Sequence, residues 1–251
     1  MKNKIYSLII ALIVCVNVQA VGEFNLEKAE QAYVAAEYDV ALDVYNSALD
    51  MGYESADLYY NVANCYYRKG ELAASILNYE RALKLEPSHE DAKHNLEFAE
   101  SQTVDKIDVL GSVFLVDWWN AFTNITSADT WSFISIVLFI IVLIGLSLYV
   151  FVRKMWVRKL GFSVSVIALF FTIISLISAN SRYNVETSSS SAIVFMQTVT
   201  VKSSPDSSGN DLFILHEGTK VNVKSWLGNW VEISTLDGNS GWVPASAIEV
   251  I

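Results

Sequence analysis

Few residues of this chain have the types and spacing that catalysis or metal binding requires. Histidine and cysteine are the side chains most often used for such work, and the sequence holds three histidines and two cysteines. His89 and His94 are five residues apart with no third ligand evident nearby, so we expect both on the solvated face of one helix. Cys65 has no histidine at metal-ligand spacing and is interpreted as a small buried apolar residue, with a reactive thiol as the alternative.

Motifs for catalysis are also missing from the sequence. It contains no Walker A loop, no Gly-x-Gly-x-x-Gly, no Gly-x-Ser-x-Gly and no His-Glu-x-x-His. A Cys-His peptidase domain would need roughly 100 further residues with their own core. Because every segment fits a non-catalytic assignment, we predict that the chain is not an enzyme and uses no metal or cofactor.

Residues 21–101 carry an internal repeat. Ala29 is matched by Ala63 and Tyr45 by Tyr79, and both pairs are 34 residues apart. This period, with small and aromatic residues recurring, is typical of tetratricopeptide repeats, in which two helices cross closely at the alanines. The pattern predicts two helix pairs and a closing helix.

The concave groove of such arrays is lined by the first helix of each pair and binds peptides or helices. Asparagine and arginine there could hold a peptide backbone or a C-terminal carboxylate, whereas most tyrosines could equally serve packing. The groove candidates are Tyr33, Tyr60, Asn64, Tyr67, Arg68 and Asn95.

Glycine and proline indicate where these helices end. Gly70 should end the first helix of the second copy and Pro87 should stop its second helix. Ser88 is placed to cap a closing helix over about residues 90–101. The first copy departs from the pattern, because Ala36 stands where Gly70 does.

Two apolar runs, 131–152 and 160–179, lack charged residues and are each about as long as a membrane-spanning helix. The segment 153–159 between them is predicted to be a basic cytoplasmic loop, which places both flanking modules on the opposite side. Its topology-setting residues are Arg153, Lys154, Arg158 and Lys159. The lack of ionisable residues in either run argues against transport.

The segments that flank these runs are also assigned. Residues 1–20 read as a signal peptide, with an uncleaved anchor or a lipoprotein site at Cys15 as alternatives. Residues 102–130 are predicted to link the repeat to the first span through an amphipathic helix at the membrane interface, or alternatively a partner-binding helix. The helical spacing rests on Ile107, Leu110, Val113, Phe114 and Trp118.

After a polar linker at 180–190, residues 191–251 alternate apolar and polar residues between glycine turns. We predict five short strands in a small barrel: 199–201, 212–215, 220–224, 230–233 and 241–243. The spacing resembles bacterial SH3-like domains, on the segments 200–205, 215–218, 228–231 and 237–244. Trp226, Trp230 and Trp242 are candidates for an aromatic groove, with core packing as the alternative for Trp230 and Trp242.

Charge and composition narrow the class of partner. The chain is 53% hydrophobic with a net charge of −10, and residues 21–105 hold 17 acidic and 6 basic residues, a net charge of −11. Nucleic-acid binding needs a basic surface and is therefore not expected. The fold class is a multidomain membrane protein: an all-α repeat, a two-helix transmembrane hairpin and an all-β SH3-like barrel.

The order of these modules closely resembles the BatE family of aerotolerance-operon proteins. The resemblance rests on the repeat at 56–87, on Asp129-Thr-Trp131 and on the segment 212–220. It implies an inner-membrane protein that acts with other Bat proteins and a MoxR-type ATPase. The function we predict is a membrane-anchored periplasmic scaffold that binds other membrane or periplasmic proteins. The alternative is a cell-wall-linked stress sensor whose barrel binds peptidoglycan.

Overall fold

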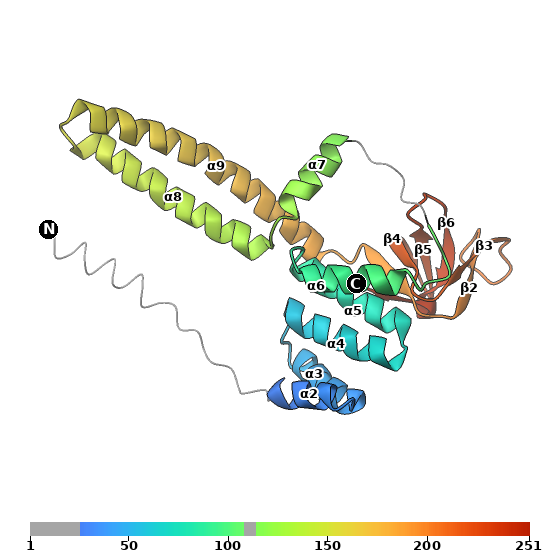
Figure 1. Ribbon diagram of the computed structural model, residues 1–251. Helices are drawn as coiled ribbons and strands as arrows, with labels where there is room; N and C mark the ends of the chain where they lie inside the picture. Colours follow the sequence, from blue (N-terminus) through green and yellow to red (C-terminus); the bar gives the residue numbers. More distant parts are fainter. Residues whose placement is uncertain (1–25, 108–113) are drawn as a thin grey trace.

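A computed structural model describes residues 26–107 and 114–251, and it shows a helical repeat, a long helical hairpin and an antiparallel sheet (Figure 1). The predicted signal peptide, 1–20, lies outside the described residues, as do Leu110 and Val113.

The helical repeat consists of two antiparallel helix pairs and a closing helix. The helices are α2 (Leu26–Val34), α3 (Tyr38–Asp50), α4 (Ala56–Lys69), α5 (Leu72–Leu85) and α6 (Glu90–Glu100). Fully buried alanines stand where helices cross, namely Ala29, Ala41, Ala63, Ala82, Ala92 and Ala99. Small side chains at these positions let the helix backbones approach one another.

The ends of the repeat helices follow the sequence signals with one exception. Ser55 caps α4 by accepting a hydrogen bond from the Leu58 amide, and Gly70 ends α4 in the left-handed conformation at φ +80°. Ala36 adopts the same left-handed region at φ +60° in the first copy. The prediction that Ser88 caps the closing helix was wrong: His89 is the cap, and its Nδ1 accepts from the Ala92 amide at 3.2 Å. An imidazole nitrogen substitutes here for the usual hydroxyl or carboxylate oxygen.

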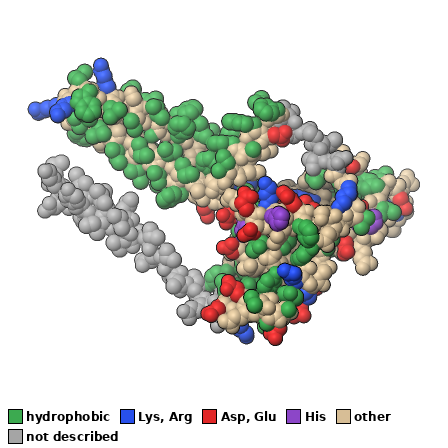
Figure 2. Space-filling model, viewed as in Figure 1, with side chains coloured by type: hydrophobic (Ala, Val, Ile, Leu, Met, Phe, Trp, Pro, Cys, Tyr) green, Lys and Arg blue, Asp and Glu red, His purple; other side chains and the backbone are tan. Residues whose placement is uncertain are grey.

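The hairpin pairs α8 (Ala128–Phe151) with α9 (Met155–Thr187), preceded by the short helix α7 (Phe114–Thr123). Among the described residues, α8 and α9 are the two helices long and apolar enough to span a membrane, with mean hydropathies of 2.9 and 2.5 over an 18-residue window of each. Apolar side chains cover the hairpin up to a tip of basic residues (Figure 2).

A seam of small residues on α9 holds the hairpin together. Most buried positions of α9 recur at alternating steps of four and three residues, namely Gly161, Ser165, Ala168, Thr172, Ser175, Ala179 and Arg182, and Ser178 is buried beside Ala179. Gly145 on α8 lies so close that a Cβ there would be 2.7 Å from the Gly161 carbonyl oxygen. Ser165 and Ser175 donate hydrogen bonds across the seam, to the Val142 and Trp131 carbonyls. Close approach at small residues is how helices associate in membranes.

The structure differs from the expected division of the chain at three places in and before the hairpin. Met155–Lys159 form the first turn of α9, so the predicted basic loop shortens to about residues 152–154. The predicted linker at 180–190 is largely helical, because α9 continues to Thr187 on bonds made by Arg182 and Glu186. Ile107, expected in the amphipathic helix, instead packs against the core of the sheet.

Residues 191–250 form a seven-stranded antiparallel sheet in the order β3-β2-β6-β5-β4-β1-β7. The strands are β1 (Ser191–Val194), β2 (Thr198–Lys202), β3 (Asp211–His216), β4 (Lys220–Leu227), β5 (Trp230–Ser234), β6 (Ser240–Pro244) and β7 (Ile248–Val250). Buried residues from all seven strands make one core cluster, so the sheet curls around it in the manner of a small barrel. Strands β1 and β7 are additional to the five predicted ones; each has only three or four residues, too short for a clear alternation.

The sheet and the helical repeat share an interface. Ile193 of β1 is fully buried in the core cluster of the repeat, and Gly218 packs against α5, where an added Cβ would be 3.1 Å from Ile76 Cδ1. Lys220 forms an ion pair with Glu80 of α5 at 2.6 Å. Repeat and sheet therefore pack as one body.

Candidate functional site: the groove of the helical repeat

The candidate site is a pocket of about 390 Å³ on the concave side of the helical repeat. Its walls come from α2, α4 and α6, the first helices of successive pairs, with one residue from α5. It is lined by Tyr33, Tyr60, Asn64, Tyr67, Arg68, Tyr79, Asn95 and Phe98. The structure thus brings all six groove residues named from the sequence to one cavity, because a period of 34 returns the same helix face to the same side of the array.

Asn64 is at the centre of a hydrogen-bond network in this groove. Its Oδ1 accepts from the Tyr79 hydroxyl at 2.6 Å and from Asn95 Nδ2 at 3.0 Å. Asn95 Nδ2 also lies 3.4 Å from the Tyr60 hydroxyl. Three consecutive helices are cross-linked by these bonds, so the asparagine amides are held in fixed orientations.

Arg68 supplies the positive charge of the groove. It is exposed, and its Nε donates to the Tyr33 hydroxyl at 3.4 Å, which raises the pKa of Arg68. Among the described residues, its two Nη groups make no hydrogen bond. A planar guanidinium with both terminal nitrogens available suits bidentate binding of a carboxylate.

Tyr79 and Phe98 line the groove although they were not among the candidates. Tyr79 belongs to a second helix and reaches the groove from behind, and its burial strongly raises the pKa of its hydroxyl. Phe98 follows Asn95 by three residues, the spacing of one helix face, and this signal could have identified it. The residue is 56% exposed, and its ring offers the groove an apolar surface.

The three tryptophans of the sheet do not share one face. In the register of β4, β5 and β6, Trp242 pairs with Glu232 and Trp230 with Pro244, which puts both rings on the face opposite the buried Val231. Trp226 pairs with Val231 and so belongs to the other face, where it is 53% exposed at the end of the strand. Trp230 and Trp242 are half-buried rather than core residues.

The four basic residues predicted to set the topology lie together at the tip of the hairpin. Arg153 and Lys154 occupy the turn, and Arg158 and Lys159 lie in the first turn of α9. Arg158 Nε donates to the Tyr149 carbonyl at 3.0 Å, and its guanidinium lies 5.2 Å from the centre of the Tyr149 ring. Arg158 therefore satisfies one of the open carbonyls at the end of α8.

Cys65, His89 and His94, the residues considered for metal or thiol chemistry, have three different environments in the structure. Cys65 is fully buried in the repeat core, and burial raises its pKa to about 11, so it remains a thiol at neutral pH. His94 is exposed as expected, but His89 is not on the solvated face: its side chain is 11% exposed and stacks 4.9 Å from the Tyr60 ring. Within the described ranges, no group of three metal-binding side chains occurs.

Comparison with known families identifies two of the modules. Residues 56–89 match the tetratricopeptide repeat, and residues 197–249 match the bacterial SH3 domain. A search of curated proteins gives no significant match to the chain. The first helix pair, α2 and α3, lies outside the repeat match, in agreement with its missing glycine at Ala36. Repeats of this kind mediate protein–protein interaction, and bacterial SH3 domains are cell-wall-binding modules, both typically without catalytic activity.

Proposed function

We propose that this protein is a membrane-anchored adaptor of the bacterial envelope whose repeat groove binds an extended segment or C-terminal tail of a partner protein. The observation that carries the proposal is the groove itself: fixed amides at Asn64 and Asn95, an arginine with available donors at Arg68, and exposed aromatic surface at Phe98. Amides hold a peptide backbone and the guanidinium holds a carboxylate. No part of this recognition requires catalysis.

The hairpin would cross the inner membrane with its basic tip in the cytoplasm, so that the repeat and the SH3-like sheet both lie in the periplasm. The clustered charges of Arg153, Lys154, Arg158 and Lys159 support this orientation. A reporter fused at Met155, compared with one at the C-terminus, tests it, and a periplasmic signal at Met155 would invert the topology.

The partners we propose are other envelope proteins, with members of a Bat complex first among them. The module order and the shared body formed by repeat and sheet support a scaffold that holds two partners at a fixed spacing. The short cytoplasmic tip offers little surface for inward signalling, which disfavours a sensor.

The groove is tested with the full chain in detergent and fluorescent peptides copied from the C-terminal tails of candidate envelope partners. Each peptide is used with a free carboxylate and as the amide. We expect Arg68→Ala to weaken binding of the free-acid peptide about ten-fold, the effect of losing a charge-assisted hydrogen bond of roughly 1.5 kcal/mol. Lys69→Ala is the matched control, because Lys69 is the adjacent cation but pairs with Asp39 and Glu71 away from the groove. Equal affinity of the wild type and Arg68→Ala for every peptide would contradict the proposal that the groove binds a C-terminal tail.

A second candidate is binding of the cell wall by the sheet. The match to the bacterial SH3 domain and the exposed apolar residues Leu212, Ile214, Trp226 and Leu227 favour it. Co-sedimentation of the full chain with purified peptidoglycan tests it, with Trp226→Ala expected to lower the bound fraction. The full chain is required, because an isolated sheet would expose Ile193, which the repeat buries. A Trp226→Ala variant that sediments as wild type does would exclude Trp226 from the site.

A further inference from the structure

A pocket of about 470 Å³ lies where the repeat, the end of α9 and the sheet meet. Four basic side chains line it: Lys84, Lys93, Arg182 and Lys220. None of the described residues in its walls is acidic. In a repeat module with a net charge of −11, four cations around one cavity form a local positive site.

The charges of this pocket are only partly compensated by neighbouring acids. Lys220 pairs with Glu80 at 2.6 Å, and Arg182 lies 3.6 Å from Glu186. Lys84 donates to the backbone oxygens of Ser188 and Ile251, and Lys93 is exposed and forms no ion pair among the described residues. Among the described residues, Lys93 therefore remains without an acidic partner, and Lys84 is not paired with an aspartate or a glutamate.

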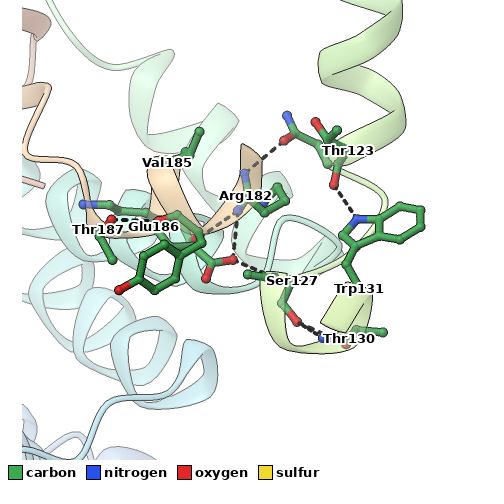
Figure 3. Close-up of polar contacts among 12 residues, drawn as sticks. Thr123, Ser127, Thr130, Trp131, Arg182, Val185, Glu186 and Thr187 are labelled. Atoms are coloured by element: carbon green, nitrogen blue, oxygen red, sulfur yellow. Dashed lines mark hydrogen bonds and ion pairs between the residues drawn. The ribbon is translucent and has the colours of Figure 1, made fainter. Parts of the chain in front are cut away.

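Arg182 adds a buried donor that lacks an acceptor. The residue is 3% exposed, and its Nη groups donate to Asn124 Oδ1 at 3.0 Å and to the Lys84 carbonyl at 2.9 Å (Figure 3). Its Nε is buried and has no hydrogen-bond partner among the described residues. Leaving a charged donor buried without an acceptor is costly, so this position favours an anionic ligand.

The pocket lies at the depth of lipid headgroups if the hairpin crosses a membrane. Arg182 follows the last residue of the apolar run, Ala179, by three residues, about 4.5 Å along the helix. The headgroup layer extends roughly 5–7 Å beyond each side of the hydrocarbon core. Asn124, also in the pocket wall, directly follows α7, whose Phe114, Leu115 and Trp118 side chains are exposed.

We propose that this pocket binds the phosphate group of an anionic phospholipid headgroup. The phosphate oxygens would accept hydrogen bonds from Lys93, Arg182 and the serine hydroxyls of the wall. A free phosphate ion has the same chemistry, but the position beside α7 and the end of the hairpin favours a phosphate carried by a lipid. The inference rests on the hairpin spanning the membrane, as in the proposed function, but not on any partner of the groove.

The test uses the full chain in detergent and native mass spectrometry with two soluble short-chain lipids, dihexanoyl phosphatidylglycerol and dihexanoyl phosphatidylcholine, and with inorganic phosphate. We expect one phosphatidylglycerol to bind saturably, and phosphatidylcholine more weakly, because its quaternary ammonium is repelled by the lysines. Inorganic phosphate should compete only at much higher concentration, since it lacks acyl chains. Equal retention of both lipids, or phosphate binding without lipid binding, overturns the proposal.

Lys93 is the residue to substitute, since it is exposed and has no structural bond that the change would break. Lys93→Gln should weaken phosphatidylglycerol binding about five-fold and Lys93→Glu by more, from the roughly 1 kcal/mol that each basic residue contributes near anionic lipid. Lys224→Glu, an equal charge change at an exposed lysine outside the pocket, should have no effect. If Lys93→Glu and Lys224→Glu weaken binding alike, the pocket is not the site. Groove peptide affinity should not change in either variant, which separates this result from a failure of the adaptor function.

Discussion

Arg182 Nη2 donates a hydrogen bond to the backbone carbonyl of Lys84, 2.9 Å away, and so joins the end of α9 to the last turn of α5. Lys84 in turn donates to the carbonyls of Ser188 and Ile251, at 2.6 and 2.7 Å. The last carbonyls of a helix have no partner within it, and here one is satisfied by the hairpin. The repeat, the hairpin and the sheet therefore meet around two side chains.

Replacing Arg182 should loosen this junction. In Arg182→Met the bonds to Lys84 and Asn124 are lost and Glu186 keeps a buried charge without its cation, a change that costs about 3 kcal/mol at such sites. We expect a lower thermal unfolding temperature of the full chain and faster proteolysis around residues 182–190.

Glu186→Gln is the control for that experiment. Glu186 Oε1 caps α8 by accepting from the Ala128 amide at 2.9 Å, and a glutamine oxygen keeps this bond (Figure 3). We therefore expect Glu186→Gln to lower the unfolding temperature less than Arg182→Met does. If Arg182→Met melts at the wild-type temperature, the junction does not depend on this residue.

A larger side chain at Gly161 should disrupt the packing of α8 against α9. A Cβ at Gly161 would be 2.7 Å from the Gly145 carbonyl oxygen and 3.4 Å from the Tyr149 amide nitrogen, so the backbone of α8 leaves it no room. In Gly161→Ile we expect α8 and α9 to separate, seen as a longer distance between spin labels at Phe139 and Val166. Phe162→Leu, a change at the next and exposed residue, should leave the distance unchanged. Equal distances in all three proteins would contradict the packing.

The left-handed residues Ala36 and Gly70 should respond in opposite ways to exchange of alanine and glycine. An alanine at positive φ is strained by roughly 1 kcal/mol, so Ala36→Gly should stabilise the repeat and Gly70→Ala should destabilise it. No atom lies within 4 Å of a Cβ built on Gly70, so the effect is one of backbone conformation alone.

The buried thiol of Cys65 can report this change. Its labelling requires local opening of the repeat, so in a Cys15→Ser background the rate should fall about five-fold in Ala36→Gly and rise about five-fold in Gly70→Ala. Ala35→Gly, one residue before the left-handed position, should not slow labelling. Rates that move in the same direction for Ala36→Gly and Gly70→Ala would contradict the assignment.

The groove could be predicted from the sequence because it depends on a local period. Once the spacing of 34 residues identified α4 as a first helix, Tyr60, Asn64 and Tyr67 followed from helical geometry alone. Asn95 followed from the same argument applied to the closing helix. Phe98 was within reach of this reasoning, whereas Tyr79 was not, since it reaches the groove from a second helix.

The junction could not be predicted, because it depends on contacts between residues far apart in the chain. Arg182 bonds to residues 58 and 98 positions away, and the segment that holds it reads as a polar linker in the sequence. The strand β1 is similarly hidden: its Ile193 is buried against the repeat rather than in the core of its own sheet. Local periodicity indicates that a residue is buried, but not which module covers it.

Asp105 should make the contact between repeat and sheet depend on pH. Its carboxylate accepts from the His216 amide and the Thr219 hydroxyl, both at 2.7 Å, and it also contacts His216 Nδ1. Burial by itself raises the pKa of Asp105, but the hydrogen bonds from Thr219 and His216 outweigh it, and the pKa is lowered. A carboxyl with a lowered folded-state pKa adds stability above its unfolded value, about 3.9, and this stability is lost as the pH falls through the folded value.

We therefore expect the unfolding temperature of the full chain to fall between pH 6 and pH 3, with part of the fall assigned to Asp105. In Asp105→Asn the protein should be less stable at pH 6, since one acceptor oxygen becomes a donor facing the His216 and Thr219 donors, and the fall toward pH 3 should be shallower. Thr219→Val removes a single bond to the carboxylate. Its unfolding temperature at pH 6 should therefore lie between those of the wild type and Asp105→Asn. A pH profile of Asp105→Asn parallel to that of the wild type would show that the carboxylate does not couple the two modules to pH.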